Sequence, residues 1–150
     1  MTQIGSVRVT VTVDVDIETA FEVFTTETDQ WYRRGASTLG VRHRSQGLRI
    51  EPRSGGRLIE LDEQGEEGRE RGRVTVWEPP SRLVFVDRHD TEVDVRFEDR
   101  GGRTRVVLEH RGLDQLPPDR AATATKYSWR LLVDWFALYL NEEPRWMLSR

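Results

Sequence analysis

Apolar and polar residues alternate strictly near the start of the chain. Val7, Val9, Val11, Val13 and Val15 are separated by single arginine, threonine and aspartate residues. In a strand, successive side chains point to opposite faces. This period of two therefore predicts a β-strand with one buried face.

A helical period follows. Asp16 is a candidate N-cap, because its carboxylate can accept a hydrogen bond from a backbone N–H of the first helical turn. The next apolar residues recur at helical spacing: Ile17, Ala20, Phe21 and Phe24. A short amphipathic helix is predicted here. Trp31-Tyr32 is predicted to stand on a second short helical turn.

The segment from Leu48 to Leu113 predicts a six-strand antiparallel meander, in which apolar and polar residues alternate. Glycine reaches positive φ freely and proline cannot donate to a ladder, so both residues end strands. Turn signals separate the strands: Gly55-Gly56, residues 64–68, Pro79-Pro80, His89-Asp90 and residues 99–102.

Pairing across these turns predicts one apolar face. The predicted partners are Val76 with Val84, Val74 with Val86, Val86 with Val93, Val84 with Val95, Val95 with Val106, and Val93 with Leu108. A slip of one residue would scatter these side chains over both faces, so their shared face supports the register. The same register puts Trp77, Leu83 and Phe85 on the opposite, outer face. Such a patch is either a protein contact, for example a homodimer interface, or is covered by neighbouring arginine side chains.

One long helix is predicted from Asp119 to Asn141, and residues 141–150 are expected to form a loose tail. The apolar stripe of this helix is small in its first half and large in its second half. The small residues are Ala121, Ala124, Thr125 and Ser128, and the large ones are Leu131, Leu132, Trp135, Leu138 and Tyr139. Laid across a curved sheet, such a helix would leave space beneath its first half, which predicts a cavity.

Several phrases of the chain resemble one protein family. Pro52-Arg53-Ser54-Gly55-Gly56-Arg57 resembles its P-x-x-G-G-R turn, and residues 72–85 resemble its G-x-V-x-x-W-E-P-P-x-R-L-V-F segment. Residues 91–93, 97–98 and 104–113 continue the likeness. Together they resemble the START and birch-pollen-allergen superfamily (SRPBCC), in the branch named for the activator of the heat-shock-protein-90 ATPase. The long helix of that branch usually carries Gly-Trp, where this chain has Ser128-Trp129.

This resemblance implies a single bacterial-type α+β domain over residues 1–150 with the helix-grip fold. In that fold a curved antiparallel sheet of about six to seven strands wraps around a long C-terminal helix, with two short helices after the first strand. Members enclose an apolar cavity between sheet and helix. Relatives bind lipids or aromatic natural products, cyclise polyketides or assist a chaperone, so the fold alone does not fix the function.

Composition narrows the range of partners. The net charge is −3 with interleaved signs, whereas a nucleic-acid-binding face needs a basic excess. The chain has no cysteine, which excludes disulfides and thiolate metal sites. Its apolar runs stay well below the roughly 18 residues of a membrane span. The N-terminus lacks a signal-peptide pattern. A cytoplasmic protein without cofactor or membrane span is expected.

Catalytic candidates are few. His43, His89 and His110 lack metal-ligand spacing, so no metal site is predicted. His110 falls on the inner face and is either a structural histidine at a strand end or an acid–base catalyst. Tyr127 is the other catalytic candidate. Four carboxylates alternate with apolar residues as exposed strand positions do: Glu60, Asp62, Glu92 and Asp94.

The sequence therefore predicts a small-molecule binding protein that holds an apolar or aromatic ligand between the sheet and the C-terminal helix. One alternative is a polyketide cyclase- or hydrolase-like enzyme that uses His110 or Tyr127. A second alternative is a co-chaperone-like protein-binding module. The predicted ligand-binding residues are Trp31, Ile50, Val95, Leu108, Ala124, Ser128 and Trp135.

Overall fold

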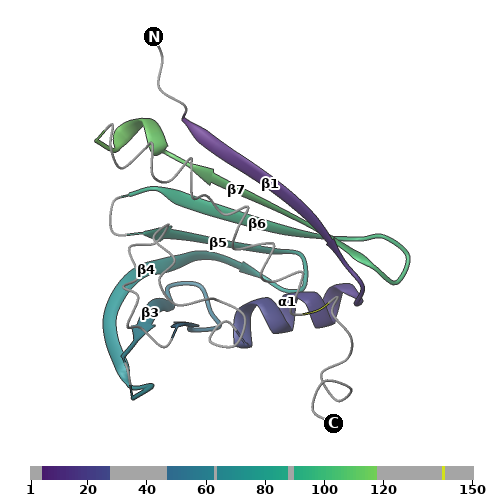
Figure 1. Cartoon of the computed structure of the whole chain (residues 1–150), viewed down its shortest axis with the longest axis horizontal. Helices are drawn as coiled ribbons and strands as arrows, with labels where there is room; N and C mark the ends of the chain where they lie inside the picture. Colours follow the sequence, from purple (N-terminus) through teal and green to yellow (C-terminus); the bar gives the residue numbers. More distant parts are fainter. Residues whose placement is uncertain (1–4, 28–46, 63, 88–89, 118–139, 141–150) are drawn as a thin grey trace.

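In the part of the chain that the structure describes, seven antiparallel strands form one sheet in the order β1-β7-β6-β5-β4-β3-β2, and the helix α1 (Ile17–Thr26) lies against it (Figure 1). The computed structural model describes residues 5–27, 47–62, 64–87, 90–117 and 140 of the chain. The strands are β1 Ser6–Val13, β2 Gly47–Ile50, β3 Arg57–Leu61, β4 Glu67–Glu78, β5 Arg82–Asp87, β6 Glu92–Asp99 and β7 Thr104–Arg111, and a 3₁₀ turn covers Leu113–Gln115. The predicted six-strand meander is confirmed as β2 to β7.

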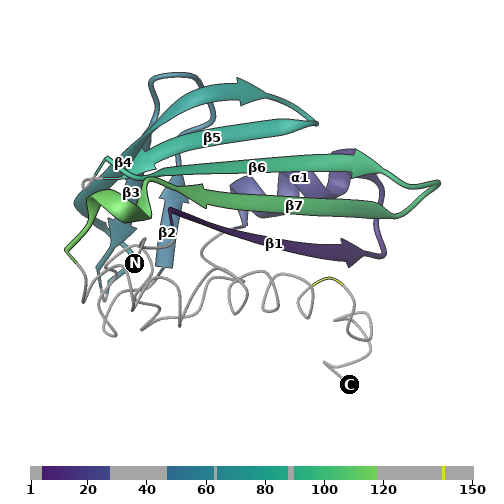
Figure 2. The same ribbon diagram turned by 90° about the horizontal axis from the view of Figure 1, so that it is seen from above.

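The predicted first strand and first helix are both confirmed. β1 pairs with β7 over its whole length, so the first strand adds to the meander beside β7 and forms one edge of the sheet. The Asp16 carboxylate accepts a hydrogen bond from the Thr19 backbone N–H at 2.8 Å, which satisfies a donor that the first helical turn leaves free. α1 packs against β6 and β2 on one face of the sheet, as Figure 1 and Figure 2 show from two directions.

The core lies on the face of the sheet that α1 covers, which we call the inner face. Phe21 and Phe24 of α1 are buried there against Phe97 of β6. The remaining members of the core cluster come from α1 and from the strands, and are Ala20, Val23, Val9, Val13, Leu48, Ile50, Leu58, Val74, Leu83, Phe85, Val93, Val95, Val106 and Leu108.

The predicted register of β5 is wrong by one residue. Leu83 pairs with Val95 and Phe85 pairs with Val93, where Val84 and Val86 had been expected. The Asp87 N–H bonds to the Thr91 carbonyl at 3.0 Å, so the hairpin loop enclosed by this pair of residues is three residues long. A three-residue hairpin loop of this kind needs a left-handed residue at its end, and Asp90 has φ 62°. A two-residue turn at His89-Asp90 would have kept the valines inside.

The predicted outer patch of Trp77, Leu83 and Phe85 is consequently wrong. Leu83 and Phe85 are 0% and 2% exposed in the core, and Trp77 packs edge-on against Phe21 with ring centroids 5.1 Å apart. The patch therefore offers no support for a homodimer interface.

The predicted pairing within the hairpin of β4 and β5 is right at one end and wrong at the other. Val76 does pair with Val84, and both lie on the outer face, but Val74 pairs with Phe85 instead of Val86. The register shift at Thr75 is a β-bulge, which keeps Val74 in the core after Val76 has turned outward.

The register between β6 and β7 differs from the prediction by two residues, which preserves the faces. Val95 pairs with Leu108, and Val93 pairs with His110. The connecting loop lies at residues 100–103, where the Arg100 N–H bonds to the Arg103 carbonyl at 2.8 Å. The four side chains Val93, Val95, Val106 and Leu108 stay inside as predicted.

Several predictions fall outside the described residues. These are the second short helical turn at Trp31-Tyr32, the long helix Asp119–Asn141 and the tail 141–150. Leu140 is described, and it is helical and packs against the core cluster. Among the described helices, none has the length and apolar character that crossing a membrane requires.

Candidate functional site

The inner face brings together the predicted ligand-binding residues that the structure describes. Val95 and Leu108 are direct cross-strand partners on β6 and β7, and both are 0% exposed. Ile50 belongs to the same core cluster on β2, at the opposite edge of the sheet. The predicted residues Trp31, Ala124, Ser128 and Trp135, and the catalytic candidate Tyr127, lie outside the described part of the chain.

One end of the inner face is aromatic. Phe21 makes edge-to-face contacts with Trp77 and Phe97 at centroid distances of 5.1 and 5.2 Å, and Phe24 contacts Phe97 at 5.6 Å. Edge-to-face pairs add stability beyond the burial of their area. This end of the face is the part that α1 covers, because Phe21 and Phe24 come from that helix.

The other end of the inner face carries buried polar side chains on adjacent strands, which we call the polar row. Its place follows from the register. Asp87 pairs with Gly72 and lies two residues past the core residue Phe85, on the side away from Leu83. The row consists of Glu60 on β3, Arg71 on β4, Asp87 on β5, Thr91 just before β6 and His110 on β7, with exposed fractions of 8%, 6%, 9%, 0% and 1%.

Glu60 and Arg71 form a buried ion pair within this row. The Arg71 Nε and Nη2 atoms lie 3.1 and 2.9 Å from Glu60 Oε1. Glu60 is the cross-strand partner of Leu48 and stands two residues from Leu58, and both leucines belong to the core. The pair therefore faces inward. Burying two charges costs free energy that only their mutual attraction and further hydrogen bonds offset.

A β-bulge in β4 places Arg71 beside Glu60. Gly72 pairs with Leu58 and Glu70 pairs with Ile59, which leaves Arg71 as the extra residue of β4. Gly72 itself has no room for a side chain, since a Cβ there would lie 2.3 Å from the Val86 carbonyl oxygen. The glycine lets β4 approach β5 closely beside the ion pair.

Asp87, Thr91 and His110 form the second part of the polar row. Asp87 Oδ1 accepts a hydrogen bond from the Thr91 N–H at 3.1 Å, and Thr91 Oγ1 lies 2.8 Å from His110 Nε2. Burial lowers the pKa of His110 to about 4, against the opposing effect of the Asp87 charge. The imidazole is therefore neutral near pH 7. The predicted place of His110 on the inner face is confirmed.

The outer face holds charged residues of a different kind. Asp94 is 2% exposed, and its carboxylate accepts hydrogen bonds from Arg82 at 2.9 Å, Arg111 at 3.1 Å and Arg96 at 3.3 Å. Burial alone would raise the pKa of Asp94, but these arginines outweigh it and hold the pKa below its usual value. The predictions that Asp94 and Glu60 are exposed strand positions are both wrong.

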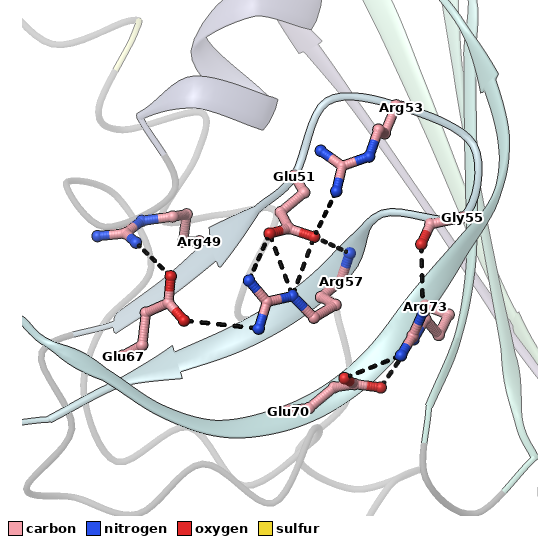
Figure 3. A network of polar contacts seen from close by, with 8 residues as sticks. All are labelled: Arg49, Glu51, Arg53, Gly55, Arg57, Glu67, Glu70 and Arg73. Carbon is pink, nitrogen blue, oxygen red and sulfur yellow. Dashed lines mark hydrogen bonds and ion pairs between the residues drawn. The ribbon is translucent and has the colours of Figure 1, made fainter.

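A second outer-face network surrounds the turn after β2 (Figure 3). Glu51 accepts hydrogen bonds from the Arg57 side chain and backbone N–H, each as short as 2.7 Å, and these lower the pKa of Glu51 to about 2. Glu67 lies 3.4 Å from Arg49 and 3.5 Å from Arg57, while Arg73 pairs with Glu70 at 2.8 Å. Most of these side chains are exposed, so the network pairs positive and negative charges on the protein surface.

The sequence reasoning missed four members of the polar row: Glu60, Arg71, Asp87 and Thr91. Glu60 has the same strand parity as Leu58, and Asp87 has the same parity as Phe85, so alternation placed both on the inner face once the register of β5 was known. Arg71 gave no such signal, because it is a bulge residue. The described residues hold no cluster of three or more histidines and carboxylates suited to a metal ion.

Comparison with known proteins gives one family and many structures of similar fold. The sequence profile described as activator of Hsp90 ATPase homolog 1-like protein matches residues 14–141. Among curated proteins, no match was found.

Txn09 and CalC are similar solved structures that share more than one quarter sequence identity with this chain. Txn09, described as an anthrahydroquino-γ-pyrone synthase complexed with SUM, is 28% identical over 84% of this chain and 96% of its own, with a TM-score of 0.55. CalC from Micromonospora echinospora, described as a self-sacrificing resistance protein, is 26% identical over 93% of this chain and 98% of its own, with a TM-score of 0.65. CalU16 from the same organism, at 19% identity, 95% and 79% coverage and a TM-score of 0.61, shows the shared fold.

Proposed function

Since the chain belongs to the family of activator of Hsp90 ATPase homolog 1-like proteins, within the SRPBCC superfamily, we propose that it is a small-molecule binding protein. Its ligand is an apolar or aromatic compound held against the inner face of the sheet. The observation that carries the proposal is the continuous apolar wall that Ile50, Val95 and Leu108 help to form. Binding sites for small molecules are mostly apolar, with few polar groups placed among them.

The comparisons add weight to an aromatic ligand. Txn09 is described as a synthase of an anthrahydroquino-γ-pyrone. The structural match covers 84% of this chain and 96% of Txn09. The aromatic end of the inner face, with Phe21, Trp77 and Phe97, suits flat rings because such rings stack or pack edge to face.

An enzyme of the cyclase or hydrolase type is the second candidate, favoured by His110 beside Thr91 on the inner face. An imidazole with a pKa of about 4 is a weak base near neutral pH. For this reason we place ligand binding first. The co-chaperone alternative stays a prediction of the sequence.

A fluorescence titration tests the proposal. 1-Anilinonaphthalene-8-sulfonate is titrated into the wild-type protein and two variants that add the same bulk on opposite faces. Val95→Phe adds volume at the inner wall, while Val86→Phe adds it on the outer face of β5. We expect micromolar binding by the wild type, at least tenfold weaker binding by Val95→Phe, and a change of less than twofold for Val86→Phe. Absence of binding to the folded wild type, or equal loss in both variants, contradicts the proposal.

A further inference from the structure

The two edge strands of the sheet, β1 and β2, differ in length and in their protection against pairing with another chain. β2 has only four residues and is followed by Pro52, and both features limit further pairing. β1 has eight residues without proline or lysine, and its register with β7 contains no bulge. Among the strands that the structure describes, none pairs with the other side of β1 (Figure 1, Figure 2).

Alternate residues of β1 direct their backbone groups away from β7. Just before the strand, the Gly5 carbonyl accepts a hydrogen bond from the Leu113 N–H at 3.0 Å. Just after it, the Val15 carbonyl accepts one from Thr104 Oγ1 at 2.8 Å. Both carbonyls point toward the β7 side, and backbone groups alternate in direction along a strand. The odd-numbered residues of β1 therefore bond to β7, and the even-numbered residues point to the edge of the sheet.

The side chains of β1 are complementary to those of a second copy in an antiparallel pair centred on Val11. In this register Val11 stands opposite Val11 of the other chain, and Val9 stands opposite Val13 on the inner face. On the outer face Thr10 stands opposite Thr12. Such β-branched residues favour strands and pack well as cross-strand pairs. The parity fits as well, because the even-numbered residues supply the backbone bonds between the chains.

Charge distinguishes this register from its neighbours. Arg8 stands opposite Asp14 of the other chain, and both residues are exposed. Asp14 already accepts a hydrogen bond from Arg103 Nε at 2.7 Å, and a carboxylate has room for further donors. A pair centred on Thr10 would lose this opposite charge. A pair centred on Thr12 would place Arg8 opposite Asp16, whose carboxylate caps α1.

We propose that the chain forms a symmetric homodimer, in which the β1 strands of two copies pair antiparallel about Val11 and join the two sheets into one. The contact is self-complementary, as a two-fold interface requires. It consists of a single strand pair, so the interface is small and the dimer is reversible. The inference goes beyond the proposed function and does not depend on it, because it concerns an edge of the sheet and not the inner face.

An introduced thiol tests the register directly, since the chain has no cysteine. Opposite residues without backbone hydrogen bonds between them have Cα atoms about 4.5 Å apart, a distance that a disulfide spans. Val11→Cys creates such a pair on the two-fold axis, and we expect a covalent dimer after mild oxidation. Thr10→Cys is the matched control. Its own copy lies diagonally across the pair, so it should give at least tenfold less covalent dimer.

Sedimentation velocity up to millimolar concentration measures the dimer without a cross-link. Thr10→Pro removes an N–H that points to the edge and none that bonds to β7, so the variant should fold and dimerise at least tenfold more weakly. Thr10→Val retains the N–H and should dimerise like the wild type. Circular dichroism checks the fold of each variant.

A charge exchange gives a second test that leaves the backbone unchanged. Arg8→Glu should weaken the dimer at least threefold, and the double variant Arg8→Glu/Asp14→Lys should restore it. Arg69→Glu makes the same change of charge at an exposed position of β4 and should have no effect.

Three results would overturn the inference: a wild type that is monomeric up to millimolar concentration, a folded Thr10→Pro variant that dimerises normally, or equal cross-linking of Thr10→Cys and Val11→Cys. If Thr10→Pro does not fold, failure of the charge exchange to restore the dimer has the same consequence. None of these results affects the proposed function, which the fluorescence titration tests separately.

Discussion

The two faces of the sheet differ in how far their charged side chains are exposed to water. On the outer face, Asp94 sits among three arginines whose side chains are 34–51% exposed, so the positive charges remain hydrated. On the inner face, the side chains of Arg71 and Glu60 are only 7% and 11% exposed. Exposed ion pairs contribute little to stability, whereas a buried pair must overcome the loss of water around both charges.

The difference indicates what each group of charges does for the protein. The outer networks connect neighbouring strands and keep the outer surface of the sheet polar. The polar row does not serve the surface in this way, because its members are buried, and a buried ion pair is stabilising only where its attraction and hydrogen bonds outweigh the loss of water.

The largest effect that tests this comparison comes from breaking the inner pair. Arg71→Met leaves the Glu60 carboxylate buried without its arginine, and we expect the free energy of unfolding to fall by about 3–5 kcal/mol. Glu60→Leu/Arg71→Met should recover to within about 1 kcal/mol of the wild type or exceed it. Urea denaturation measures both. Arg73→Met on the outer face is the control and should leave the unfolding midpoint unchanged; if it matches Arg71→Met, the two faces do not differ.

A smaller effect concerns His110 and the pH. The unfolded chain binds a proton at this residue below pH 6.5, while the folded protein does so only below about pH 4. Between these values the unfolded state holds more protons, so the stability due to His110 is complete above pH 6.5 and declines as the pH falls toward 4. At about 1.4 kcal/mol per pH unit the loss is at most about 3 kcal/mol.

Urea unfolding of wild type and His110→Gln at several pH values between 4 and 7 measures this effect. The glutamine does not titrate, so the stability difference between the two proteins should change with pH across this window and be constant above it. A difference that stays constant down to pH 4 would show that His110 protonates in the folded state as readily as in the unfolded chain.

The sequence predicted the order of elements because local patterns determine them. Alternation of valines defined β1, the Asp16 cap and helical spacing defined α1, and glycine and proline marked the turns of the meander. The face of β5 could not be read in this way. It depends on whether the hairpin loop before Thr91 has two or three residues. The loop has three, with Asp90 in the left-handed conformation at its end.

The candidate site was predictable for its apolar half and not for its polar half. Val95 and Leu108 followed from alternation, and the structure pairs them directly. Burial of Asp94 depends on Arg82 and Arg111, which are 12 and 17 residues away along the chain. Local alternation contains no information about such cross-strand neighbours, so it predicts that a carboxylate between valines is exposed.

The smallest effect concerns this outer carboxylate. Asp94→Asn keeps the size of the side chain but removes the charge that three arginines share, and we expect the free energy of unfolding to fall by about 1–2 kcal/mol. Glu98→Gln is the matched control on the same strand, where an exposed carboxylate pairs with Arg100 at 2.9 Å, and its unfolding midpoint should not move. Urea denaturation at pH 7 measures both. A loss for Asp94→Asn as large as that for Arg71→Met would mean that water does not relieve the outer arginines, and the contrast between the two faces would then have to be abandoned.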